Sequence, residues 1–123
     1  MTVHELPLTM TWVSVIPLDR LIPDRGVAAI VDGHPVAVFL LADGSLHAVD
    51  NVDPCSGASV LSRGIVGEVD GTPTLASPMY KQRFELPTGR CLDADVRVDV
   101  HDVHVIGGTF VVRLARRILT MAA

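Results

Sequence analysis

Short apolar runs separated by Asp-Gly or Gly-Gly pairs constrain the fold of this chain more than any other feature. A two-residue hairpin turn needs positive φ at its central residues, a conformation that Gly adopts freely and Asp tolerates. Because runs rich in Val, Ile and Leu lie on both sides of each pair, the pattern predicts a series of antiparallel hairpins. The four pairs are Asp32-Gly33, Asp43-Gly44, Asp70-Gly71 and Gly107-Gly108.

The apolar runs predict an all-β domain, a single small antiparallel sandwich or barrel over residues 1–123 with a lead-in at 1–11. We expect one helical turn at 18–22 and a helical tail at 115–123. The phase of the alternation changes near His101-Asp102, which predicts a bulge there. The expected strands are 12–16, 27–31, 36–41, 46–49, 65–69, 74–76, 96–100, 103–106 and 110–114.

Composition and charge narrow the class of protein. Hydrophobic residues make up 49% of the chain, yet the longest apolar run, 36–42, is far shorter than the ~18 residues that span a membrane. The N-terminal residues lack the features of a signal peptide, so we expect a cytoplasmic location. A net charge of −4 and a pI of about 5.6 argue against a nucleic-acid partner.

Two Pro-containing segments interrupt the apolar runs and are connected by a hairpin of their own. Proline fixes φ, and small polar residues favour turns, so both segments are expected to form rigid loops. The connecting hairpin would place the loops opposite each other across a small sheet. The segments are Asp53-Pro54-Cys55-Ser56-Gly57-Ala58 and Ser77-Pro78-Met79-Tyr80.

The nucleophilic and metal-ligating side chains match no motif for catalysis or metal binding. Cys55 has no His within seven residues on either side, which favours a small, partly buried thiol over a reactive or metal-bound one. Cys91 is expected in the core, and both thiols are expected to be free. The histidine spacing fits no ligand set and predicts surface or sheet-edge positions. The histidines concerned are His34, His47, His101 and His104.

Five residues beside the loops are candidates for binding a partner. Arg63, Lys81 and Arg83 would form a basic rim that attracts an acidic surface, or they are ordinary solvated charges. Met79 and Tyr80 have two alternative roles in the same way, because such side chains anchor interfaces when exposed and fill space when buried. For Tyr80 we expect the buried position, because loops that hold no ligand would otherwise leave a cavity.

The paired loops resemble the cluster-binding half of a Rieske iron-sulfur domain, in which a Cys-x-His loop and a Cys-x-x-His loop hold a two-iron cluster. On that pattern Asp53 and Cys55 take the first pair of ligand positions, and Ser77 and Tyr80 take the second. A Rieske centre needs two thiolates and two imidazoles, whereas these positions supply one thiol and no imidazole. The resemblance implies a Rieske-like fold with a smaller two-loop subdomain, and the residues predict that it holds no cluster.

Longer blocks around the loops resemble the small subunit of assimilatory NAD(P)H-dependent nitrite reductase. The blocks are DNVDPCSGASVLSRGIVG and ASPMYKQRFELPTGRCLD, and the similarity covers roughly residues 12–114. Cys55 departs from that family, in which an aromatic residue is more usual at this position. The resemblance does not cover the tail after residue 114.

In that family a large subunit carries the NAD(P)H and FAD sites, an iron-sulfur cluster and the sirohaem at which nitrite is reduced to ammonium in nitrate assimilation. The resemblance implies that this chain is the small, non-redox subunit, which binds the large subunit through the loops and stabilises or orders it. The chain's own residues predict no catalytic, cofactor-binding or metal-binding group. Two alternatives stay open: a Rieske-type [2Fe–2S] electron-transfer protein, and a separate enzyme that uses Cys55.

Overall fold

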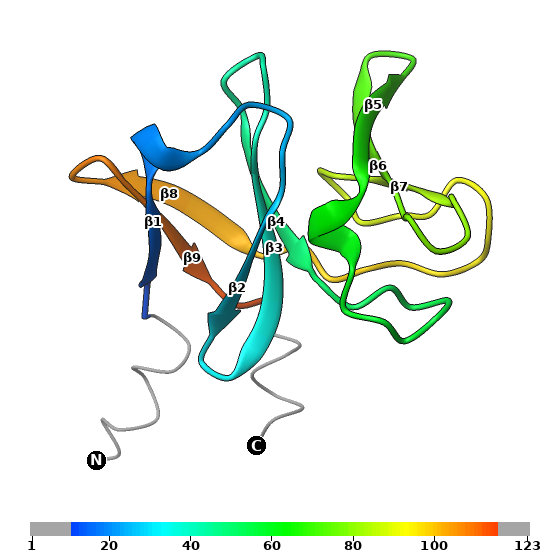
Figure 1. Ribbon diagram of the computed structural model, residues 1–123, viewed down its shortest axis with the longest axis horizontal. Coiled ribbons are helices and arrows are strands. Elements are labelled where there is room, and N and C mark those ends of the chain that lie inside the picture. The colour runs from blue at the N-terminus through cyan, green and yellow to red at the C-terminus, as the bar shows by residue number, and fades with distance from the viewer. Residues whose placement is uncertain (1–10, 116–123) are drawn as a thin grey trace.

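The structure is a computed structural model that describes residues 11–115, and these residues form three antiparallel sheets of three strands each (Figure 1). The sheet orders are β1-β9-β8, β2-β3-β4 and β5-β6-β7. The all-β antiparallel prediction is therefore confirmed. The elements are β1 (Val13–Pro17), η2 (Leu18–Arg20), β2 (Val27–Val31), β3 (His34–Leu40), β4 (Leu46–Asp50), η3 (Leu61–Arg63), β5 (Ile65–Val69), β6 (Thr72–Ala76), β7 (Arg83–Glu85), β8 (Asp102–Ile106) and β9 (Thr109–Arg113).

Strand β3 is the structural centre, because both of its faces are buried. Successive side chains of a strand point to opposite faces, so Val36 and Val38 enter one core cluster while Ala37 and Phe39 enter the other. The first cluster joins β2-β3-β4 to β9, and the second joins β3 to the β5-β6-β7 sheet. Burial on both faces explains why this part of the sequence is continuously apolar rather than alternating.

Three of the four predicted pairs form two-residue hairpin turns with positive φ at both positions. The φ values are 48° and 80° in Asp32-Gly33, 50° and 82° in Asp70-Gly71, and 58° and 77° in Gly107-Gly108. The Asp43-Gly44 pair lies in a longer loop, because the backbone N–H of Leu41 donates to the carbonyl of Ser45 at 2.9 Å. In this pair Gly44 alone has positive φ, at 89°.

The segment that returns from the small sheet to β8 differs from the prediction of a strand at 96–100. It makes single bridges, from Arg97 to Arg90 and from Val100 to Val49. Its neighbours change along its length, so no strand runs beside it for long enough to form a ladder. Val98 is nevertheless buried in the core.

The short helical turn predicted after the first strand is present as η2, whereas the predicted tail helix at 115–123 lies outside the described residues except for Ala115. Cys91 is buried in the second core cluster, and Cys55 and Cys91 are both free thiols, as predicted. Among residues 11–115, no helix is long and apolar enough to cross a membrane.

Candidate functional site

The two Pro-containing segments form closed loops at one end of the β5-β6-β7 sheet. The first loop runs from Asp53 to Ala58 and is closed by a hydrogen bond from the Asp53 amide to the Ala58 carbonyl, at 2.8 Å. The second loop runs from Ser77 to Gln82 and is closed in the same way, at 2.9 Å. The predicted hairpin, β5-β6, connects the two loops and brings them to the same end of the sheet.

The Asp53 carboxylate joins the two loops from within. It is completely buried and accepts hydrogen bonds from the Ser77 hydroxyl at 2.5 Å and the Gln82 side-chain amide at 2.8 Å. A third bond, from the Cys55 backbone N–H at 2.7 Å, turns the first loop around the same carboxylate. Because Ser77 and Gln82 are also buried, these contacts fix the second loop relative to the first.

This arrangement does not fit a Rieske cluster. Asp53 and Ser77 stand at the two positions where the pattern has cysteine, and they bond to each other across the space between the loops. Cys55 and Tyr80 stand at the two histidine positions, and both are exposed. The donors are one thiol, one phenol, one hydroxyl and one carboxylate, which is not the set that holds a two-iron centre.

The outer surface of the loops exposes apolar side chains beside Lys81, which corrects two predictions. Tyr80 is 65% exposed and Met79 is 46% exposed, so Tyr80 does not fill the position of a cluster. The buried network of Asp53 and Ser77 occupies that region instead. Cys55, predicted to be partly buried, is also exposed. We call the surface formed by Cys55, Met79, Tyr80 and Lys81 the tip.

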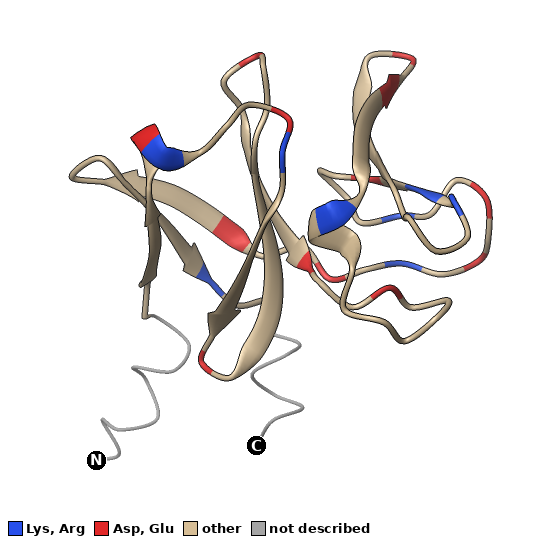
Figure 2. Cartoon of the chain, viewed as in Figure 1, with Lys and Arg blue, Asp and Glu red and all other residues tan. Residues whose placement is uncertain are grey.

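The three predicted basic residues have different surroundings. Arg83 forms a two-pronged contact with Asp93, at 2.9 and 3.1 Å, and the Arg83 hydrogen bonds lower the pKa of the Asp93 carboxyl to about 2. Arg63 lies in η3 and is exposed, as is Lys81 in the second loop. Figure 2 shows basic and acidic positions side by side on both halves of the described ribbon.

A second polar cluster, which the sequence did not predict, lies where β3 begins and β4 ends. The Asp50 carboxylate contacts Nε2 of His34 at 2.7 Å and Nε2 of His101 at 2.8 Å. Burial by itself would raise the pKa of Asp50, but the hydrogen bonds from His101 and His34 outweigh it and lower the pKa. The predicted surface position of His101 is wrong, since its side chain is completely buried.

The three residues could hold a metal ion by proximity, but the tautomer of His101 argues against it. Nδ1 of His101 accepts a hydrogen bond from the Ala115 backbone N–H at 2.9 Å, so in the neutral ring Nε2 carries the proton. A metal-binding histidine instead donates from its second nitrogen to a carboxylate or carbonyl. The cluster is therefore a hydrogen-bonded link between β3, β4 and the segment before β8.

The other two histidines are not part of a larger site. His47 contacts the Ser45 hydroxyl at 3.0 Å, and partial burial lowers its pKa. His104 is exposed, and its ring lies 5.9 Å from the Trp12 ring. Their surface and sheet-edge positions agree with the prediction.

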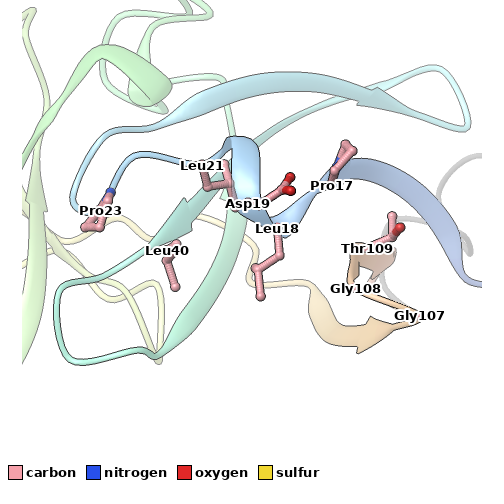
Figure 3. Close-up of a pocket in the computed structure, with 9 residues that line it drawn as sticks. All are labelled: Pro17, Leu18, Asp19, Leu21, Pro23, Leu40, Gly107, Gly108 and Thr109. Carbon is pink, nitrogen blue, oxygen red and sulfur yellow. The ribbon is translucent and has the colours of Figure 1, made fainter.

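A shallow groove of about 700 Å³ lies between η2, β3 and the β8-β9 turn (Figure 3). Its lining includes Leu18, Leu21 and Leu40, and Asp19 is the one ionisable side chain among the lining residues. A catalytic pocket combines apolar walls with several converging polar groups. This groove has no such group of side chains, so the paired loops are the better candidate site.

Comparison with known proteins gives the family of the chain. Residues 11–113 match the model of the Rieske-like [2Fe-2S] domain family. The nitrite reductase (NADH) small subunit of Salmonella typhimurium is 38% identical over 104 residues, which cover 83% of this chain and 96% of that protein. A crystal structure described as the NADH-dependent nitrite reductase small subunit of Mycobacterium tuberculosis is 49% identical, with a TM-score of 0.81, over 85% of this chain and 96% of that one.

A third relative is a much longer protein. The nitrite reductase [NAD(P)H] large subunit of Klebsiella oxytoca contains a stretch that is 39% identical over 82 residues. The match covers 67% of this chain and 8% of that large subunit.

Proposed function

Because this chain belongs to the family of nitrite reductase small subunits with a Rieske-like [2Fe-2S] domain, we propose that it serves a nitrite reductase complex as a non-redox subunit. It binds the large subunit of that complex through the tip. One observation carries the proposal: apolar and basic side chains are exposed on two loops whose buried side chains are hydrogen-bonded to each other.

The chemistry of the tip is suited to a protein partner. Tyr and Met are enriched in the cores of interfaces, and both side chains are exposed here. Loops that are already ordered lose little conformational freedom on binding. In the Klebsiella oxytoca protein, the stretch related to this chain is part of a large subunit itself, which supports the large subunit as the partner.

We propose further that the chain carries no iron-sulfur cluster and no other redox group. The donor set at the four ligand positions supports this, and Asp53 and Ser77 are already bonded to each other. By the family resemblance, the large subunit carries the NAD(P)H and FAD sites, an iron-sulfur cluster and the sirohaem that reduces nitrite to ammonium for nitrate assimilation. The role left to this chain is to stabilise or order the large subunit.

Substitution at the tip tests the binding proposal. Tyr80→Ala should raise the Kd for the large subunit about tenfold, as for the loss of an interface anchor. Ile106→Ala is the matched control, because Ile106 is an apolar side chain with 53% exposure on another sheet. Titration of labelled small subunit with purified large subunit measures both. Equal affinity of Tyr80→Ala and the wild type would refute binding through the tip.

Iron and acid-labile sulfide content tests the non-redox proposal. We expect protein purified anaerobically without its partner to be folded, colourless and free of both elements. Near-stoichiometric iron and sulfide, with a two-iron visible spectrum, would make the chain an electron carrier. With that outcome, the Kd values of the wild type and Tyr80→Ala would still test binding through the tip separately.

A further inference from the structure

Lys81 has an unusual backbone conformation for its side chain. Its φ is 62°, in the left-handed region that Gly adopts without strain. Asp24, Asp32 and Asp70 are the other non-glycine residues with positive φ among residues 11–115, and Asp is one of the short side chains that tolerate this region. A long side chain with no local hydrogen bond to offer is disfavoured there. Lys81 is therefore a position at which Gly would fit the backbone better.

The loop contacts hold Lys81 in this conformation. Its own N–H donates to the Ser77 carbonyl at 2.9 Å, and the Ser77 N–H donates to the Gln82 carbonyl at 2.9 Å. Ser77 and Gln82 are in turn held by the Asp53 carboxylate. The residues that fix Lys81 are buried, whereas Lys81 itself is exposed.

The charge of Lys81 has no counterpart within the described chain. Among the described arginines, Arg83 pairs with Asp93, Arg90 with Glu85 and Arg113 with Asp102, whereas Arg20, Arg25, Arg63 and Arg97 form no ion pair. Lys81 is the single lysine of the sequence, and its ammonium makes no hydrogen bond or ion pair with residues 11–115. Strained backbone that the surrounding contacts impose tends to occur at functional sites.

We propose that Lys81 is the electrostatic anchor of the tip and binds a carboxylate on the surface of the large subunit. This inference rests on the proposed function and adds the chemistry of the partner: an acidic group that the compact lysine ammonium reaches on its flexible stem. The hydrogen-bonded loops keep the charge beside Tyr80 and Met79, so apolar and ionic contacts act on one patch. Arg83, the next basic residue along the chain, is already paired with Asp93, and Arg63 lies outside the second loop, in η3.

Two substitutions separate the backbone from the charge. Lys81→Gly removes both the strain and the ammonium, whereas Lys81→Gln keeps a long side chain and removes the charge alone. We expect the free Lys81→Gly protein to have a urea midpoint equal to or above that of the wild type. Both variants should bind the large subunit about tenfold more weakly than the wild type at low salt. The difference in affinity should be smaller at roughly 0.5 M salt, because salt screens the interaction between charges. Lys81→Arg, which keeps the charge, should bind nearly as well as the wild type.

The outcomes distinguish this inference from the proposed function. Wild-type protein that fails to bind the large subunit would overturn both. If the wild type binds and Tyr80→Ala weakens binding, but Lys81→Gly and Lys81→Gln bind normally, the lysine anchor alone is refuted. Weak binding by Lys81→Gly with normal binding by Lys81→Gln would also refute it, because backbone geometry rather than charge would then be responsible. A lower urea midpoint for Lys81→Gly would overturn the argument from strain.

Discussion

Replacement of Asp53 by Ala should destabilise the chain more than a typical substitution. The change leaves two buried side-chain donors, the Ser77 hydroxyl and the Gln82 amide, without an acceptor. A hydrogen bond to a charged group contributes roughly 2 kcal/mol, and an unsatisfied buried donor costs a similar amount. We therefore expect Asp53→Ala to lower the free energy of unfolding by about 4 kcal/mol, a large part of the 5–15 kcal/mol of a typical domain.

Asp53→Asn is the conservative comparison. Its side-chain oxygen can still accept from the Cys55 and Gln82 donors, and the Ser77 hydroxyl can turn to accept from the new amide, so a loss of about 1–2 kcal/mol is expected. Asp95→Ala, at an exposed position, serves as the control and should change stability by less than ~0.5 kcal/mol. Urea unfolding followed by circular dichroism gives all three values. If Asp53→Ala were as harmless as Asp95→Ala, the carboxylate would not be what joins the loops.

Two further predictions concern the rest of the fold. The pKa of Asp50 is below its ordinary value of 3.8, so its ionised form stabilises the folded state above that pH, and this contribution is lost as the pH falls through the lowered pKa. Asp50→Asn should therefore destabilise the chain at neutral pH and show a shallower decline in stability below about pH 4 than the wild type, by urea unfolding at several pH values. Gly89 has a φ of 79°, and an added Cβ would meet the Val98 carbonyl oxygen at 2.0 Å, so Gly89→Ala should cost about 3 kcal/mol in the same assay. Gly33→Ala, with a φ of 80° and open space, should cost only about 1 kcal/mol, and equal losses for the two variants would contradict the role of the clash.

Local sequence signals predicted the parts of the fold that local rules control. Asp-Gly and Gly-Gly pairs predicted three two-residue turns, because positive φ at two successive residues leaves few other sequences. The fourth pair failed because Ser45 extends the loop, and an Asp-Gly pair alone does not report loop length. The candidate loops were located correctly because proline and small polar residues at their ends break a strand wherever they occur.

Contacts between distant residues could not be predicted in this way. His34, Asp50 and His101 meet because the β3-β4 pairing aligns Val36 with Asp50 and because His101 lies on the segment that crosses back beside β4. No spacing in the sequence encodes that crossing. Tyr80 was misplaced for a related reason: the polar network that fills the region between the loops depends on Gln82, which the Rieske pattern did not identify as important.

The four ligand positions divide the paired loops into a buried inner layer and an exposed outer layer. In a Rieske centre all four side chains would converge on the irons, but here the inner pair, Asp53 and Ser77, bond to each other and the outer pair, Cys55 and Tyr80, face solvent. The two layers should respond differently to substitution. Tyr80→Ala should weaken binding with little effect on stability, because an exposed side chain contributes few buried contacts. Asp53→Asn should lower both the affinity for the large subunit and the stability of the chain, because it loosens the support beneath the tip. A loss of stability with unchanged affinity would show that the partner does not need the loops held in place.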